Sequence, residues 1–167
     1  MSRFITSTPP LLVLSALLTV ACGAPEEDCA EDDFTVIREF AGPAWDPEDG
    51  LLEEPRSTYA AHATFAKMRP EKREQFLAHV DEVVAQMEES GGLIGFSYGV
   101  SDTCDTIRTV GVWTDEDAIR EFAYSGSHML AIAEFGMLAS RGATSRWELA
   151  GDQLPPSIED GERELER

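Results

Sequence analysis

The spacing of apolar and polar residues predicts four β-strands in one domain that spans residues 57–150. Apolar side chains alternate with polar or small ones along residues 57–65, 93–100, 107–113 and 143–149. Such a period of two is typical of strands that bury one face. The third segment ends in Trp113 and is rich in β-branched and aromatic residues, which also favours a strand.

Two helices are predicted between these strands. The first begins at Pro70 and ends before Gly91, because apolar residues recur at helical spacing along this stretch. The second begins after Thr114, which is a good N-cap, with Asp117 placed to complete a capping box. A run of small residues from Ser125 to Ser127 then breaks this helix, and Ser127 can cap a second helical piece.

The order strand, helix, strand, strand, helix, strand is that of the ferredoxin-like motif. We therefore expect an α+β fold in which both helices lie on one face of an antiparallel sheet. The other face must be covered as well. The second strand carries Gly95, Ser97 and Gly99 on one side, and these small residues permit close approach by a helix, a partner subunit or a ligand.

The first 21 residues have the pattern of a bacterial signal peptide. Arg3 is the only charge before an apolar stretch from Leu11 to Val20, which is short for a transmembrane helix. The small residues before Cys22 resemble a lipobox, in which the cysteine is diacylated. We expect a signal peptide over residues 1–21 and lipidation of Cys22. Ordinary signal cleavage is the alternative.

The rest of the chain divides by composition. Residues 22–56 are expected to form the lipidated N-terminus, an acidic tether and a lead-in, because Gly, Pro and acids dominate the start of this segment. Residues 57–150 form the predicted domain. Residues 151–167 are expected to form a C-terminal arm or an acidic tail.

The chain is strongly acidic, with 32 Asp and Glu against 13 Lys and Arg and a net charge of −19. The sequence has no basic stripe, so we expect no nucleic-acid partner. An anionic membrane surface would repel the body, so attachment is expected through acyl chains. The predicted location is the cell envelope, anchored to a bacterial membrane. A soluble periplasmic or secreted form is the alternative.

Two cysteines remain when Cys22 is assigned to lipid. An exported protein meets an oxidising compartment, and a disulfide between Cys29 and Cys104 is therefore expected. Such a bond would pin the tether to the domain. Two unpaired thiols are the alternative.

The region from Thr109 to Ala133 resembles the antibiotic-biosynthesis-monooxygenase-like families of the dimeric α+β barrel superfamily, over roughly residues 57–160. The resemblance is carried by Trp113, Ala118, Phe122, Ser125 and His128, and then by a strand with Trp147 and by Leu154-Pro155-Pro156. It implies a homodimer in which two sheets pack together. It also implies a C-terminal segment that crosses to the partner.

The resemblance further implies a pocket between the second helix and the sheet for a small apolar or aromatic ligand. The predicted lining is Trp113, Phe122, Tyr98 and Trp147. Haem-degrading relatives ligate iron through a histidine on the second helix, so His128 is a candidate ligand and haem a candidate cofactor. Other members of the superfamily use no cofactor, and cofactor-free oxygenation stays open. The alternative is a structural histidine at the helix break.

His62 is the second candidate catalytic residue, because it lies on the first strand where relatives place a polar pocket residue. It is a candidate general base or hydrogen-bond donor, and packing at a subunit interface is the alternative. No metal site is expected, since the sequence has neither a His-Glu-x-x-His nor a Cys-x-x-Cys pair.

We expect an exported, lipid-anchored, monooxygenase-like protein that acts on a small apolar or aromatic molecule. The alternative is a non-catalytic ligand-binding or structural envelope lipoprotein on the same fold. The two hypotheses differ in a structural requirement: an enzyme needs His62 and His128 in one cavity.

Overall fold

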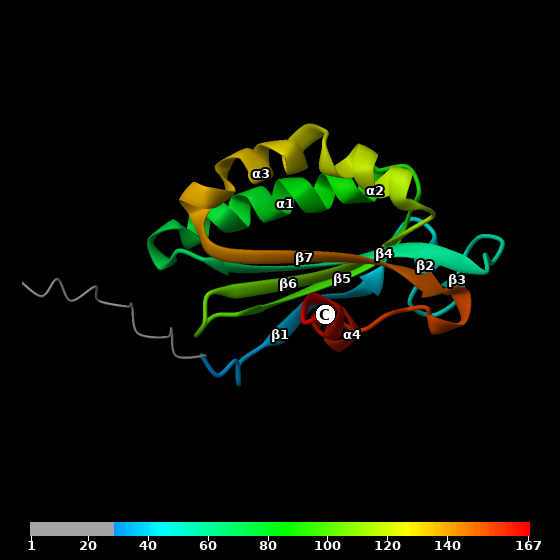
Figure 1. Cartoon of the computed structure of the whole chain (residues 1–167), viewed down its shortest axis with the longest axis horizontal. Coiled ribbons are helices and arrows are strands. Elements are labelled where there is room, and N and C mark those ends of the chain that lie inside the picture. The colour runs from blue at the N-terminus through cyan, green and yellow to red at the C-terminus, as the bar shows by residue number, and fades with distance from the viewer. Residues whose placement is uncertain (1–28) are drawn as a thin grey trace, which may run out of the picture.

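The computed structural model describes residues 29–167 (Figure 1). The predicted signal peptide and the lipidation site Cys22 lie outside the described residues. Within the described part, no helix is long and apolar enough to cross a bilayer.

The main sheet has five antiparallel strands in the order β1-β5-β6-β4-β7. Its strands are β1 (Thr35–Ala41), β4 (Thr58–Met68), β5 (Leu93–Ser101), β6 (Thr106–Trp113) and β7 (Ala139–Ala150). A small second sheet pairs β2 (Trp45–Asp46) with β3 (Gly50–Leu51). The helices are η1 (Pro70–Lys72), α1 (Arg73–Glu89), α2 (Glu116–Ala123), α3 (Gly126–Leu138), η2 (Gly151–Gln153) and α4 (Ile158–Leu165).

The α+β, ferredoxin-like class is confirmed. Helices α1, α2 and α3 lie on one face of the sheet, and β5, β6, β4 and β7 follow the order of that motif (Figure 1). The helix break is also present, but its caps differ from the prediction. Asp115 rather than Thr114 caps α2, because its carboxylate accepts from the N–H of Ala118 at 2.9 Å. The N-cap of α3 is Ser125 instead of Ser127.

The lead-in belongs to the domain, which therefore begins before residue 57. Strand β1 pairs with β5 at the edge of the main sheet. The small residues of β5 make this possible, because Phe40 lies against Gly95 and Phe34 against Gly99, where a Cβ would come within 2.7 and 2.5 Å of the two rings. The space that the sequence left open for a helix, a partner or a ligand is thus filled by the lead-in.

A core lies on the sheet face opposite to α1, α2 and α3. Its buried members are Phe40, Tyr59, Ala61, Ile94, Val112 and Leu149, and Trp45 and Leu51 of the small sheet pack against them. The chain itself therefore covers much of the face that the resemblance assigned to a partner subunit.

The C-terminal prediction is corrected in the same way. Residues 151–167 are neither a tail nor an arm that crosses to a partner, since α4 lies on the chain's own β4, β6 and β7 (Figure 1). Ser157 and Asp160 form a capping box that starts α4. The helix can approach closely because Gly161 has no side chain, and a Cβ there would meet that of Ala63 at 3.1 Å.

A disulfide and two ion pairs fix the lead-in and α4 to the rest of the domain. Cys29 is bonded to Cys104, with the Cα atoms 5.7 Å apart, which is the pairing expected from the sequence. Arg108 of β6 forms ion pairs with Glu31 of the lead-in and with Glu162 of α4.

Candidate functional site

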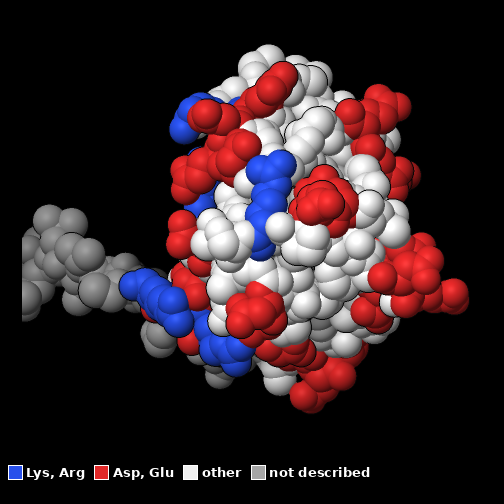
Figure 2. Space-filling view, turned by 90° about the vertical axis from the view of Figure 1, so that its right-hand side faces the viewer, with Lys and Arg blue, Asp and Glu red and all other residues white. Residues whose placement is uncertain are grey.

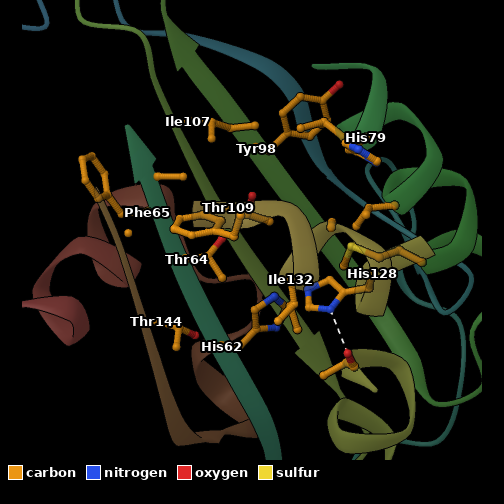
Figure 3. Close-up of a pocket in the computed structure, with 18 of the residues that line it drawn as sticks. His62, Thr64, Phe65, His79, Tyr98, Ile107, Thr109, His128, Ile132 and Thr144 are labelled. Carbon is orange, nitrogen blue, oxygen red and sulfur yellow. Dashed lines mark hydrogen bonds between the residues drawn. The ribbon is translucent and has the colours of Figure 1, made fainter. Parts of the chain in front are cut away.

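A cavity of about 530 Å³ lies between the sheet and helices α1, α2 and α3 (Figure 3). This volume suits a ligand the size of a small cofactor or drug. Most of the lining is apolar, with Phe76, Val80, Val83, Phe122, Ile132 and Phe135 on the helices. Polar groups are few and therefore informative, and His62 and His128 are among them.

The sheet side of the cavity is organised in rows that run across the strands. The register places Gly111, His62 and Arg146 side by side on β6, β4 and β7. The next row contains four hydroxyl groups, because Tyr98, Thr109, Thr64 and Thr144 are cross-strand neighbours on β5, β6, β4 and β7. Three of these, the threonines, were not predicted as site residues. The threonines can be recognised as a row only when the register of the strands is known, and the sequence does not provide the register.

His62 is buried and held by the indole of Trp113. The Trp113 Nε1–H donates to His62 Nδ1 at 3.0 Å, and both side chains are buried. The imidazole fits because its neighbour on β6 is Gly111, where a Cβ would lie 2.4 Å from the ring carbon Cε1. A larger residue at position 111 would displace His62.

The environment keeps His62 neutral. Burial, and then the nearby His128 and Arg146, lower the pKa of His62 to about 4. A neutral imidazole that accepts at Nδ1 carries its proton on Nε2. His62 therefore offers the cavity an N–H donor, an assignment that follows from the Trp113 hydrogen bond.

His128 enters the cavity from the first turn of α3. Its Nδ1 lies 3.0 Å from the carbonyl oxygen of Ala123, to which it donates (Figure 3). Its ring also packs on Phe122, with centroids 4.5 Å apart. Burial lowers the pKa of His128, the Ala123 hydrogen bond opposes this, and Arg146 lowers the pKa further.

The two histidines therefore have opposite hydrogen-bonding character at Nε2. His62 presents a donor there, and His128, whose proton is on Nδ1, presents a lone pair. Two rings connect them, because Trp113 packs on His62, Phe122 packs on Trp113, and His128 packs on Phe122. A ligand can thus be met by one acceptor and one donor in apolar surroundings.

Gln86 of α1 fixes the break from which His128 projects. Its Oε1 accepts from the backbone N–H of His128 at 2.9 Å, and its Nε2 donates to the carbonyl oxygens of Phe122 and Ser125. The break can approach Gln86 because residue 126 is glycine, with a φ of 51°. This role cannot be predicted from the sequence, since Gln86 looks like any polar residue of an amphipathic helix.

One side of the cavity opens between α3 and the edge strand β7. Phe135 of α3 lies against Gly142 of β7, where a Cβ would come within 2.3 Å of the ring. Ala143, Thr144 and Arg146 continue this border and are exposed. On the opposite border, His79 Nε2 of α1 and Glu134 Oε2 of α3 lie 3.1 Å apart and tie the two helices together.

The predicted pocket residues fall into three groups. His62, His128, Tyr98 and Phe122 all line the cavity. Trp113 lies just behind the lining, fully buried, where it orients His62. Trp147 was misplaced, because its side chain packs in the core on the opposite face of the sheet. Strand alternation explains this, since its neighbour Arg146 points to the cavity.

A metal centre built from side chains finds no support here. Among residues 29–167, no group of three or more His, Cys, Asp or Glu side chains is arranged to hold a metal ion.

Residues 58–134 match the model of the antibiotic biosynthesis monooxygenase family. The fold is similar to a protein from Shewanella oneidensis (TM-score 0.51, 13% identity, 57% of this chain and 95% of that one). It is also similar to a protein of unknown function from Nitrosomonas europaea (TM-score 0.50, 14% identity, 60% and 98%). A comparison with curated proteins found no match. The family match contains both His62 and His128, and so the segment that builds most of the cavity is similar to antibiotic biosynthesis monooxygenases.

Proposed function

We propose that the protein is a monooxygenase-like enzyme that acts on a small apolar or aromatic molecule in this cavity. One observation carries the proposal: His62 and His128 project into the same apolar cavity and offer opposite hydrogen-bonding groups. An apolar pocket with a few convergent polar groups is the usual form of a small-molecule site. The match to the monooxygenase family supports the reaction class.

His128 is the proposed general base. At neutral pH its lowered pKa leaves Nε2 unprotonated, so the lone pair is available to accept a proton. The same lowering makes it a weak base. The substrate must therefore carry a C–H or O–H that a neighbouring carbonyl or aromatic ring has made acidic.

His62 is the proposed partner of the anion that results. Its Nε2–H can donate to an oxygen that gains negative charge when the substrate loses its proton. The electron-rich substrate then reduces dioxygen. In the balanced reaction the substrate loses two hydrogen atoms, one of its carbons gains one oxygen atom, and the second oxygen atom leaves with the two hydrogens as water.

Oxygen uptake by the full chain, with a panel of aromatic ketones and phenols that carry such acidic hydrogens, tests this proposal. We expect uptake with some members of the panel, and a loss of about a hundredfold or more in His128→Ala. Trp147→Phe is the matched control, because this aromatic residue lies on the other sheet face and should leave the rate unchanged. Uptake that survives His128→Ala would refute the role of the base.

Haem is a second candidate for the same cavity. His128 would hold the iron, since its Nε2 is unprotonated and its ring is oriented by the Ala123 carbonyl. Arg146 at the cavity border could pair with a carboxylate of the cofactor. Bound haem would supply the activation of oxygen. A haemin titration followed by absorbance should then show a saturable Soret shift that His128→Ala loses and Trp147→Phe keeps.

The rival proposal is a non-catalytic ligand-binding or structural lipoprotein on the same fold. The two proposals predict different results in the oxygen-uptake assay. A non-catalytic protein would bind an apolar aromatic ligand in the cavity and consume no oxygen. In that case His62→Gln and His128→Ala would change ligand affinity only.

The proposed location is the cell envelope, with Cys22 acylated. Mass spectrometry of the protein purified from bacterial membranes would show a diacylated Cys22 at the N-terminus. Recovery of an unmodified Cys22 in the soluble fraction would instead support the periplasmic or secreted alternative.

A homodimer is also proposed. Much of the sheet face that the resemblance assigned to the partner is covered by the lead-in and α4, so the second copy would contact these segments instead of the bare sheet. Sedimentation at micromolar concentration should report a dimer. A monodisperse monomer would exclude it.

A further inference from the structure

Helix α3 has an apolar surface on the side that faces away from the cavity. This outer face consists of Met129, Leu130, Ala133, Gly136 and Met137, all of them exposed. The exposed fractions of Met129, Leu130 and Met137 are 49%, 55% and 62%. A helix that is apolar on all sides is normally buried, so an exposed one indicates a binding surface.

The lack of charge on this face contrasts with the rest of the chain. Between Glu121 and Glu148 the sequence has a single acidic residue, Glu134, in a protein with 32 acidic residues. Glu134 is hydrogen-bonded to His79 of α1. In contrast, Figure 2 shows that acidic side chains are common at the end of the molecule on the right of Figure 1.

The C-terminal end of α3 lies at the end of the molecule where the tether is fixed. Arg69 donates its N–H to the carbonyl of Leu138 at 2.9 Å, and the adjacent Met68 donates to the carbonyl of Asp105. Asp105 follows Cys104, which holds Cys29. In Figure 1 the chain from residue 29, the end of α3 and η1 all lie at the left of the molecule.

This end also carries cationic residues. Arg69 donates its N–H to the end of α3, Lys72 lies in η1 beside Glu71, and Arg141 is the third residue of β7, which follows α3 directly. Two acids nearby, Asp102 and Asp105, pair with Arg73. Cations such as Lys72 and Arg141 attract the phosphates of phospholipid headgroups.

The length of the tether limits how far the body can lie from a membrane. Cys22 and Cys29 are seven residues apart in sequence. Fully extended, that segment reaches at most about 25 Å. If Cys22 is acylated, as proposed above, the end of α3 stays close to the bilayer surface.

We propose that the outer face of α3 rests on the phospholipid bilayer, with Met129, Leu130 and Met137 in contact with the acyl-chain boundary. This inference rests on the proposed acylation of Cys22. Because α3 also forms one border of the cavity opening, the opening then lies next to lipid. The ligand of the cavity would be an apolar molecule that dissolves in the bilayer and enters between α3 and β7.

A fluorescent label at position 130 tests the contact in the full, anchored protein. The variant Leu130→Cys is labelled with an environment-sensitive fluorophore and reconstituted into vesicles of phosphatidylethanolamine and phosphatidylglycerol. The vesicles contain a lipid with a nitroxide near the top of its acyl chain. Leu52→Cys is the matched control, because Leu52 is an equally exposed leucine (58%) in the lead-in, on the far side of the sheet.

We expect the nitroxide to quench the label at position 130 about twofold more than the label at position 52. Equal and weak quenching at both positions, in protein that floats with the vesicles, would overturn the inference while leaving acylation intact. Protein that fails to float would show instead that the anchor is absent. Emission at position 130 that shifts with protein concentration without vesicles would assign the face to a second copy, and would also overturn the inference.

Discussion

The two faces of the sheet carry similar numbers of buried apolar side chains, but one face is closely packed and the other borders a cavity. On one face the lead-in and α4 pack on the sheet, and small residues such as Gly95, Gly99 and Gly161 let these segments approach closely. On the other face, α1, α2 and α3 stand over His62 and leave a cavity. Close packing is the rule in protein interiors, so the unfilled face is the informative one.

The difference also appears in two tryptophans of the sheet. Trp147 packs among apolar neighbours on the filled face, whereas Trp113 uses its indole N–H to orient His62 on the cavity face. Mutations on the face packed by the lead-in and α4 should therefore change stability without changing the site. Mutations on the cavity face should change both the stability and the site.

The largest expected effect is the loss of the disulfide that holds the lead-in. The double variant Cys29→Ser, Cys104→Ser should lower the free energy of unfolding by about 4 kcal/mol, because the bond closes a long loop and holds the lead-in. Chemical denaturation of both proteins measures this. Ligand binding under native conditions should be unchanged, and a parallel loss of binding would show that the two faces are not independent.

The next effect is the pH dependence that His62 adds. Its pKa is about 6.5 in the unfolded chain and about 4 in the folded one, so the unfolded state binds the proton first as the pH falls. The free energy of unfolding should fall by about 3 kcal/mol between pH 6.5 and pH 4 from this group alone. His62→Gln, which can still accept from Trp113, should lack this component. Identical pH profiles for the two proteins would contradict a buried, neutral His62.

Removing the acceptor of the Trp113 N–H should have a smaller effect. His62→Leu leaves that buried indole N–H without a partner, at a cost of about 2 kcal/mol, whereas His62→Gln replaces the acceptor. Thermal unfolding of the two variants gives the comparison. Equal stability would mean that the Trp113 bond contributes little to the cavity face.

The smallest effect on stability is expected from a substitution of Gln86, because this side chain fixes the position of His128 and contributes little to packing. Gln86→Leu removes the bonds that hold the α2–α3 break and should cost about 1 kcal/mol. The oxygen-uptake rate should fall much more, because His128 is no longer fixed. Gln86→Glu keeps the acceptor for the His128 N–H, and its pH-rate profile should retain the native form if Gln86 is a positioning residue.

The strands and helices could be predicted from the sequence better than the contacts between distant segments. Alternation and helical spacing located β4, α1, β5, β6, the broken helix and β7, since each is a local pattern. The pairing of β1 with β5 and the docking of α4 were missed, because both depend on small residues in distant strands, such as Gly99 and Ala63. The tail looked acidic and exposed, and its apolar contacts are too few to form a periodic pattern.

The candidate site shows the same limit. His62 and His128 attracted attention as rare residues, and the resemblance placed them near a pocket. Their tautomers depend on Trp113 and on the Ala123 carbonyl, which only the folded chain brings to them. The assignment of Trp147 to the pocket was wrong because alternation predicts a strand but does not show which of its two sides faces the helices. The hydroxyl row and Gln86 were missed for lack of register and of helix packing.

The most direct test of this account is the nitrogen NMR spectrum of the histidine rings at neutral pH, with His79→Gln, His62→Gln and His128→Ala variants to assign the signals. We expect two neutral imidazoles of opposite type, with the proton of His62 on Nε2 and the proton of His128 on Nδ1. The same tautomer in both rings, or a charged ring in either, would contradict a cavity that offers one donor and one acceptor to its ligand.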